Sequence, residues 1–316
     1  MLKHLSRFFV LMLVLGFAGV RTAYAQEVVP TCTADTAPQA GTSEKTLEHD
    51  GLARTYLVYV PEKYDPTQPT PLVLSLHGFT SNARQQVNIS QWNPVADEHG
   101  FLVVYPQGTG FPLRWHSGQS VFESQRPVDD VGFINALLDQ LIKGFCVDAA
   151  RIYISGLSNG GGMSHRLACE MAERVAAIGG VAGAYHPGAC EPARPVPVIA
   201  FHGTADDIVP YLGGGGRDIT FPPIETWAAG WAARNGCDAE PEALAPVGVV
   251  SGVEYVNCEE DAAVMLYTIE GGGHTWPGGA ELPAFIVGVT NDDVNASEMM
   301  WEFFTAHPLP VTDDLG

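Results

Sequence analysis

Short β-rich segments alternate along this chain with segments whose apolar residues recur at helical spacing. Strands that alternate with helices pair in parallel, because each connecting helix returns the chain to the same end of the sheet. We therefore predict one α/β domain, with a mostly parallel sheet and helices on both of its faces. The predicted strands are residues 55–60, 72–76, 102–105, 151–155, 176–181, 196–201 and 264–269.

The predicted helices carry apolar residues three or four positions apart, as an amphipathic helix requires. One such set is Val131, Ile134, Leu138, Leu141, Ile142 and Phe145, and the next is Met163, Leu167, Met171 and Val175. Near the end of the chain, Asn295 and Glu298 are spaced as a capping box in front of an apolar segment that Pro308 would end.

Residues 1–25 have the pattern of a secretory signal peptide. Lys3 and Arg7 precede an apolar stretch at residues 8–20, and Ala23 and Ala25 form a small-x-small cleavage signal. An uncleaved membrane anchor is the alternative. With cleavage after residue 25, we expect a protein exported to the periplasm or to the cell exterior, without a membrane-spanning segment.

Three further divisions are predicted along the mature chain. Residues 26–46 are rich in Thr, Ala and Pro and lack periodicity, so they form an N-terminal leader. Residues 47–308 form the folded domain, and residues 309–316 form a tail.

Acidic residues far outnumber basic ones, with 36 Asp and Glu against 16 Lys and Arg and a net charge of −20. Loss of residues 1–25 removes three basic residues and no acid, which leaves 13 basic residues and a net charge of −23. Such a surface repels nucleic acid and anionic membranes. We therefore expect neither as a partner.

All six cysteines lie after residue 25, an even number in a chain expected to be exported. Three disulfides are predicted, although six cysteines allow about fifteen pairings. Proximity favours Cys169–Cys190 and Cys237–Cys258, which leaves Cys32–Cys146 to tie the leader to the domain. No Cys-x2-Cys or Cys/His spacing suggests zinc, so we expect no metal site.

Gly156, Ser158 and Gly160 form the pattern Gly-x-Ser-x-Gly between a predicted strand and a predicted helix. This context is that of a nucleophile elbow, a tight turn that presents the serine hydroxyl at the edge of a sheet. Side chains at the two glycines would collide with neighbouring backbone. A glycine-rich loop that merely starts a helix is the alternative.

A serine hydroxyl becomes a nucleophile when a histidine takes its proton and an acid orients that histidine. Asp206 and Asp207 follow the predicted strand 196–201, and His274 follows the predicted strand 264–269 after three glycines. We assign Ser158, Asp206 and His274 as a catalytic triad, with Asp207 as the alternative acid.

An acyl-transfer intermediate also needs backbone N–H groups around its negative oxygen. We assign the N–H groups of Asn159, which follows the serine, and of Phe79, in the loop after strand 72–76. His77 is expected to support that loop, and Asp130 to cap a helix or to organise a loop.

Five motifs together resemble the polyhydroxybutyrate depolymerase and feruloyl esterase family. They are HG at 77–78, VDDVGF at 128–133, GLSNGG at 156–161, HGTAD at 202–206 and GGGHTWPG at 271–278. The resemblance covers residues from about 45 to 308. It implies an α/β-hydrolase fold without a cofactor, and it assigns the triad roles to the same three residues.

By this resemblance the chain is a serine ester hydrolase whose partner is a polymeric or oligomeric ester. We also expect a monomer. Polyhydroxybutyrate-type polyesters come first, and feruloyl or acetyl esters of plant polysaccharides are the alternative. Acyl transfer to an alcohol, or binding without catalysis, remain open. We expect no separate polymer-binding domain. Trp276 and Trp115 are candidate walls of the acyl pocket, with a place in the core as the alternative.

Overall fold

The computed structural model describes residues 32, 38–118, 128–183, 190–215 and 220–310. The predicted signal peptide, residues 1–25, lies outside the described residues. No helix in the described part of the chain is long and apolar enough to cross a membrane.

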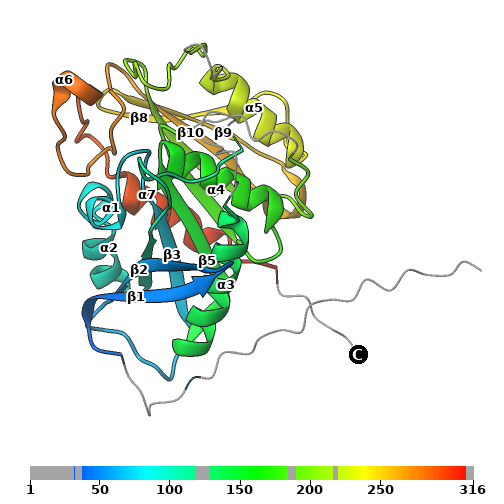
Figure 1. Ribbon diagram of the computed structural model, residues 1–316. Coiled ribbons are helices and arrows are strands. Elements are labelled where there is room, and N and C mark those ends of the chain that lie inside the picture. The colour runs from blue at the N-terminus through cyan, green and yellow to red at the C-terminus, as the bar shows by residue number, and fades with distance from the viewer. Residues whose placement is uncertain (1–31, 33–37, 119–127, 184–189, 216–219, 311–316) are drawn as a thin grey trace, which may run out of the picture.

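A sheet of ten strands forms the centre of the molecule (Figure 1). The six central strands are β4, β3, β5, β6, β7 and β10, and they pair in parallel. Two antiparallel strands extend the sheet at each edge. All seven predicted strands are confirmed as members of this sheet. The strand order is β1 (Gly41–His49), β2 (Leu52–Val60), β4 (Leu102–Pro106), β3 (Thr70–Leu76), β5 (Val147–Leu157), β6 (Ala177–Val181), β7 (Val198–Gly203), β10 (Val264–Ile269), β9 (Val250–Tyr255), β8 (Glu242–Val247).

Helices cover both faces of the sheet, as the sequence predicts. Alternate strand residues face two separate cores: Leu72 and Leu74 of β3 join the core under one set of helices, and Val73 joins the other. The first core contains α3 (Asp130–Gly144), α4 (Asn159–Glu170) and α5 (Ile224–Arg234). The second contains α1 (Ala83–Ser90), α2 (Trp92–His99) and α7 (Ala296–Ala306). Two short elements, η2 (Glu259–Asp261) and α6 (Ala284–Val287), lie in loops.

One predicted helix ends earlier in the structure than its apolar residues indicate. The helix α4 stops at Glu170, while Met171 and Val175 lie past its end in the same core. The Asn295 side chain caps α7 by accepting hydrogen bonds from the N–H groups of Ser297 and Glu298. Helices α1 and α2, each eight residues long, are too short for their apolar spacing to mark a helix, and they were not predicted; neither was α5.

The boundary predicted between leader and domain is too late in the chain. Strand β1 begins at Gly41 and pairs with β2 along its whole length, so residues 41–46 belong to the sheet. Edge strand β1 is mostly exposed and therefore lacks the apolar alternation that marks a buried strand. Strand β8, also exposed at an edge, escaped prediction for the same reason. At the other end, the Leu309 N–H donates to the Ala150 carbonyl, so the predicted tail begins attached to the domain.

The three predicted disulfides are present, and no free cysteine occurs among the described residues. Cys32–Cys146 fastens the leader beside β5, and Cys169–Cys190 joins α4 to the segment before β7. Cys237–Cys258 joins the chain after α5 to the chain after β9. The six cysteines lie outside the strands, while the loops that the bridges close contain strands of the sheet. Such closure stabilises a fold by restricting the unfolded chain.

Candidate active site

Ser158 lies in the turn between β5 and α4, with backbone angles φ 54° and ψ −119°. A serine with positive φ is strained, and such strain is typical of a nucleophile elbow. The flanking positions must be glycine, because a larger residue would collide with neighbouring backbone. A Cβ atom at Gly156 would lie 2.3 Å from the Gly160 backbone, and one at Gly160 would lie 2.2 Å from the Leu76 carbonyl oxygen. The turn is therefore the one that the sequence predicts.

Asp206 and His274 lie on loops that leave neighbouring parallel strands, β7 and β10, at the same edge of the sheet. The Nδ1 atom of His274 is 2.8 Å from Oδ2 of Asp206, and both side chains are buried. Asp207 is exposed, so the geometry favours Asp206 as the acid. Strand β5, which presents Ser158, lies in the same parallel set, two strands from β7.

The Asp206 carboxylate accepts hydrogen bonds at both oxygens. Its Oδ1 atom accepts from the backbone N–H groups of Ile208 and Val209, each at 2.8 Å. Its Oδ2 atom also lies 3.3 Å from Nε2 of His202. Burial alone would raise the pKa of Asp206, but the hydrogen bonds from His202 and His274 outweigh it and hold the pKa below the usual range.

An ionised carboxylate only accepts hydrogen bonds, so the proton of neutral His274 lies on Nδ1. The Nε2 atom of His274 is then the nitrogen that can take a proton from a hydroxyl group. His202 contacts Asp206, and its Nε2 atom also lies 2.8 Å from the Val209 carbonyl oxygen. The sequence analysis did not assign this residue. Its position four residues before Asp206, at the end of a buried strand, is the signal that was available.

The loop after β3 is held in place by His77, as predicted. The His77 Nδ1–H group donates to the Gly78 carbonyl at 2.8 Å, and Nε2 accepts from the Gly108 N–H at 2.9 Å. Burial lowers the pKa of His77 to about 4, which keeps the ring neutral near pH 7. A Cβ atom at Gly78 would lie 3.5 Å from Cβ of Ser158, so Phe79 follows directly on a residue that flanks the serine.

Asn159 is the first residue of α4, and its side chain is completely buried. The N–H groups of the first helical turn have no partner within the helix, and the helix dipole adds positive character there. The N–H groups assigned to the oxyanion, those of Asn159 and Phe79, thus come from a helix start and from the loop beside it.

Both candidate pocket tryptophans are buried. The Trp276 indole N–H donates to Oγ of Ser297 at 3.1 Å, within the core beside α7. The Trp115 indole N–H donates to the His77 carbonyl at 3.0 Å. Neither side chain has any exposed surface, which favours the core alternative for both.

Comparison with known proteins places these residues in a family. Residues 54–210 match the family described as Esterase PHB depolymerase. The protein NocK of Nocardia uniformis subsp. tsuyamanensis is 30% identical over 288 residues, which cover 84% of this chain and 83% of NocK. The chain belongs to the PHB depolymerase esterase family.

Other relatives of this PHB depolymerase family chain agree with that placement. Feruloyl esterase B of Piromyces equi is 33% identical over 233 residues, which cover 70% of this chain. The chain spans 42% of the length of that relative. The structure of acetyl xylan esterase from Aspergillus awamori has a TM-score of 0.59 and 15% identity, and it covers 83% of this chain and 99% of that one. The structural match supports the α/β-hydrolase fold.

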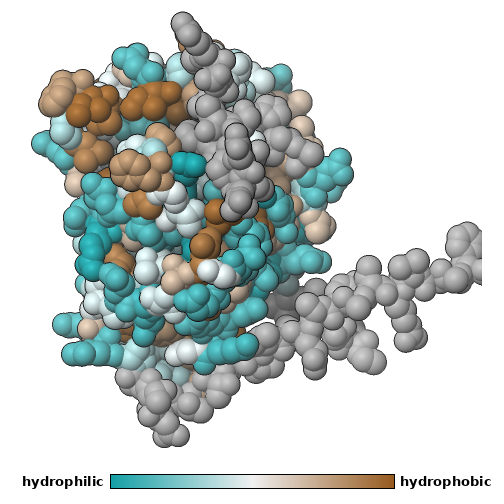
Figure 2. All heavy atoms as spheres, in the orientation of Figure 1, coloured by the Kyte–Doolittle hydropathy of each residue, from teal (hydrophilic) through white to brown (hydrophobic). Residues whose placement is uncertain are grey.

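Exposed apolar side chains gather at the carboxyl ends of the parallel strands, where Ser158, Asp206 and His274 also lie. Of the ten large apolar side chains that are exposed among the described residues, seven lie on loops after β3, β4, β7 and β10. Figure 2 shows brown, hydrophobic spheres at the upper left, where Figure 1 places α6. We call these seven the apolar rim: Phe79, Phe111, Ile208, Leu212, Phe285, Ile286 and Val289.

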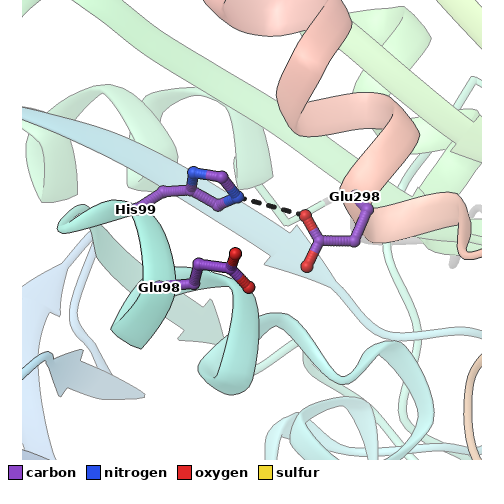
Figure 3. A group of neighbouring side chains, drawn as sticks. All are labelled: Glu98, His99 and Glu298. Atoms are coloured by element: carbon purple, nitrogen blue, oxygen red, sulfur yellow. Dashed lines mark hydrogen bonds and ion pairs between the residues drawn. The ribbon is translucent and has the colours of Figure 1, made fainter.

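A group of side chains away from the triad has the composition of a metal site. Glu98 and His99 of α2 and Glu298 of α7 offer ligand atoms within 4.8 Å of one another (Figure 3). The His99 Nε2 atom lies 3.2 Å from Oε2 of Glu298, and both side chains are about one-third exposed. Exposed carboxylates often pair with histidine without a metal ion, so we interpret this group as a hydrogen-bonded contact between α2 and α7.

Proposed function

We propose that this chain is a serine carboxylic-ester hydrolase, in which Ser158 is the nucleophile, His274 the general base and Asp206 the acid that orients it. The observation that carries the proposal is the 2.8 Å hydrogen bond between His274 and Asp206, on loops at the sheet edge where the strained turn holds Ser158. Membership of an esterase family supports the same chemistry.

In this mechanism the Nε2 atom of His274 takes the hydroxyl proton while Oγ of Ser158 attacks the ester carbonyl carbon. The tetrahedral intermediate collapses, the bond to the alcohol oxygen breaks, and His274 returns the proton to the departing alcohol. A water molecule then repeats the sequence on the acyl-enzyme, and the acid leaves. Asp206 stabilises the imidazolium in both halves of the cycle.

The carbonyl oxygen becomes negative in each tetrahedral intermediate. The N–H groups of Asn159 and Phe79 would donate to it, supported by the positive end of α4. These donors belong to a helix start and to a loop that His77 holds, so they need little rearrangement when the charge develops.

For the substrate, we propose feruloyl esters of plant polysaccharides ahead of polyhydroxybutyrate-type polyesters. The named relative with 33% identity is a feruloyl esterase, which favours the reading that the sequence analysis placed second. The apolar rim also suits an acyl group with a large apolar surface, such as an aromatic one. The three disulfides support an exported enzyme, as the predicted signal peptide does.

The nucleophile is tested by Ser158→Ala. We expect this variant to fold as the parent does and to lose a factor on the order of 10⁴ or more in kcat on a p-nitrophenyl ester. A fluorophosphonate should label Ser158 in the parent protein with one equivalent per chain. Activity retained in Ser158→Ala, or labelling of a different serine, would refute the proposal.

The substrate class is tested by comparing kcat/KM on methyl ferulate, acetylated xylan and soluble hydroxybutyrate oligomers. A preference for methyl ferulate supports the proposed order. A preference for the oligomers would favour polyhydroxybutyrate-type polyesters as the substrate and leave the serine mechanism unchanged.

A further inference from the structure

A buried charged cluster lies outside the triad, at the start of α3. The Asp130 carboxylate is completely buried and accepts from the Arg54 guanidinium at 2.7 Å through Oδ1. Its Oδ2 atom accepts from the backbone N–H of His116 at 2.8 Å and from Nδ1 of the same histidine at 2.9 Å. Although burial opposes it, the bonds from His116 and Arg54 lower the pKa of Asp130, so the carboxylate is ionised.

Removal of two charged groups from water is costly, and apolar side chains often stabilise a core as well as an ion pair does. The location of the cluster suggests a reason for it. Asp130 binds both the backbone and the ring of His116, so it fixes the segment that runs from Trp115 to Ser117.

That segment binds the side chain of Asn159, the residue after the nucleophile. The Oδ1 atom of Asn159 accepts from the Trp115 N–H at 2.7 Å. The Nδ2 group of Asn159 donates to the Trp115 carbonyl and to Oγ of Ser117, each at 3.1 Å. Three hydrogen bonds thus connect the segment to the first residue of α4.

We propose that Asp130 is a positioning residue for the oxyanion hole, because it holds the 115–117 segment that fixes Asn159 and thereby aims the Asn159 N–H. The inference rests on the proposed function, since it requires an oxyanion near that N–H group. Arg54 compensates the charge of Asp130 and holds its second oxygen.

The principal test is Asp130→Asn. The two oxygens of Asp130 receive three N–H groups, whereas an amide has one acceptor oxygen, so one N–H of the amide must face another donor. We expect kcat per active site to fall by about ten-fold or more, because a misplaced N–H loses part of what an oxyanion donor supplies. We expect KM to change by less than about two-fold, because the ground state gains little from that donor.

The matched control is Asp129→Asn. Asp129 caps α3 through a hydrogen bond to the Gly132 N–H and is 56% exposed, and asparagine caps a helix as well as aspartate does. We expect its kcat per active site to equal that of the parent. Counting active sites with a fluorophosphonate separates a loss of folded protein from a loss of turnover.

A second variant keeps the proposal testable where Asp130→Asn fails to fold. Asn159→Ala retains the backbone N–H and removes the side chain that the segment holds, so it should also lower kcat with little change in KM. Where Asp130→Asn does fold, the double variant with Asn159→Ala should be no slower than the slower single variant, because both changes break one connection. Losses that multiply, or an unchanged kcat in Asn159→Ala, would overturn the proposal.

Two variants distinguish a wrong catalytic serine from a wrong role of Asp130. If Ser158→Ala retains activity, the proposed function is wrong and no oxyanion hole exists at Asn159. If Ser158→Ala is inactive while Asp130→Asn turns over at the parental rate, only the positioning role of Asp130 is wrong.

Discussion

Among the described residues, Asp206 and Asp130 each bind the Nδ1 atom of a buried histidine, and the two pairs have almost the same geometry. The Nδ1 to Oδ2 distance is 2.8 Å between His274 and Asp206 and 2.9 Å between His116 and Asp130. In both pairs the carboxylate is completely buried and also accepts from backbone N–H groups. Distance and burial therefore do not separate a pair suited to catalysis from one that holds a loop.

The remaining partner of each carboxylate separates them. Asp130 binds the Arg54 guanidinium, a permanent cation, so its charge is compensated in the resting protein. Asp206 accepts from two backbone N–H groups and lies 3.3 Å from Nε2 of His202, which also hydrogen-bonds the Val209 carbonyl at 2.8 Å. None of these groups carries the permanent charge of a guanidinium. Asp206 thus retains its charge for the imidazolium that forms when His274 takes a proton. We infer that the presence or absence of a permanent cation beside the carboxylate determines which histidine–aspartate pair can support proton transfer.

The largest effect predicted from this comparison is that of Asp206→Asn. An amide there would favour the wrong tautomer of His274 and would stabilise no imidazolium, so kcat should fall by about 10⁴-fold. The corresponding change in the other pair, Asp130→Asn, should cost far less turnover. Steady-state kinetics of both variants on one p-nitrophenyl ester measure the difference.

Asp207→Asn is the matched control for that prediction. Asp207 is exposed and adjacent in sequence, so its amide should leave kcat within about two-fold of the parent. A large loss in Asp207→Asn with a small one in Asp206→Asn would exchange the acids. Equal losses in Asp206→Asn and Asp130→Asn would break the comparison itself.

The sequence predicts most of the catalytic pair and little of the other one. The order of serine, acid and histidine, each after a β-rich segment, follows from the requirement that parallel strands deliver their loops to one edge. Asp130 was expected to cap a helix or organise a loop, and it organises one, while its neighbour Asp129 is the cap. Arg54 lies in an edge-proximal strand and gave no signal, because a charged residue in an alternating strand normally faces solvent.

The role of Arg54 beside Asp130 can also be tested through the free energy of unfolding, with the variant Arg54→Met. This change leaves the buried Asp130 carboxylate without its cation, and removal of one partner of a buried pair typically costs about 3–5 kcal/mol. Urea unfolding at pH 7 measures the loss. The double variant Arg54→Met with Asp130→Asn should be more stable than Arg54→Met alone, because no uncompensated charge is then buried.

Arg84→Met is the control for the charge itself. Arg84 pairs with Glu44 on the surface, where the two side chains are 72% and 52% exposed, so we expect a loss below about 1 kcal/mol. An equal loss of unfolding free energy in Arg54→Met and Arg84→Met would mean that burial of the Asp130 carboxylate does not require the Arg54 cation. The contrast drawn between Asp130 and Asp206 would then have no energetic basis.

Another buried histidine, His165, extends the comparison, because it has no acid beside it. His165 lies in α4 against the rings of Trp227 and Trp231. Among the described residues, neither of its ring nitrogens has a hydrogen-bond partner. Burial, with a smaller contribution from Arg234, lowers the pKa of His165 to about 3, so the folded protein keeps this ring neutral.

The smallest predicted effect is the pH dependence that His165 gives to stability. The unfolded chain binds a proton at this histidine below pH ~6.5, whereas the folded chain binds it only near pH 3. Stability should therefore fall with acidity across that window, by about 1.4 kcal/mol for each pH unit from this residue alone. His165→Leu should remove that part of the slope while leaving the contribution of His77, whose pKa is about 4. Urea unfolding of both proteins at pH 8 measures the packing change, since His165 is neutral there in both states, and unfolding at pH 5 adds the proton. A difference between the two proteins that is the same at pH 8 and pH 5 would mean that the folded chain protonates His165 as readily as the unfolded chain does, and that an imidazole needs no carboxylate to be charged inside this fold.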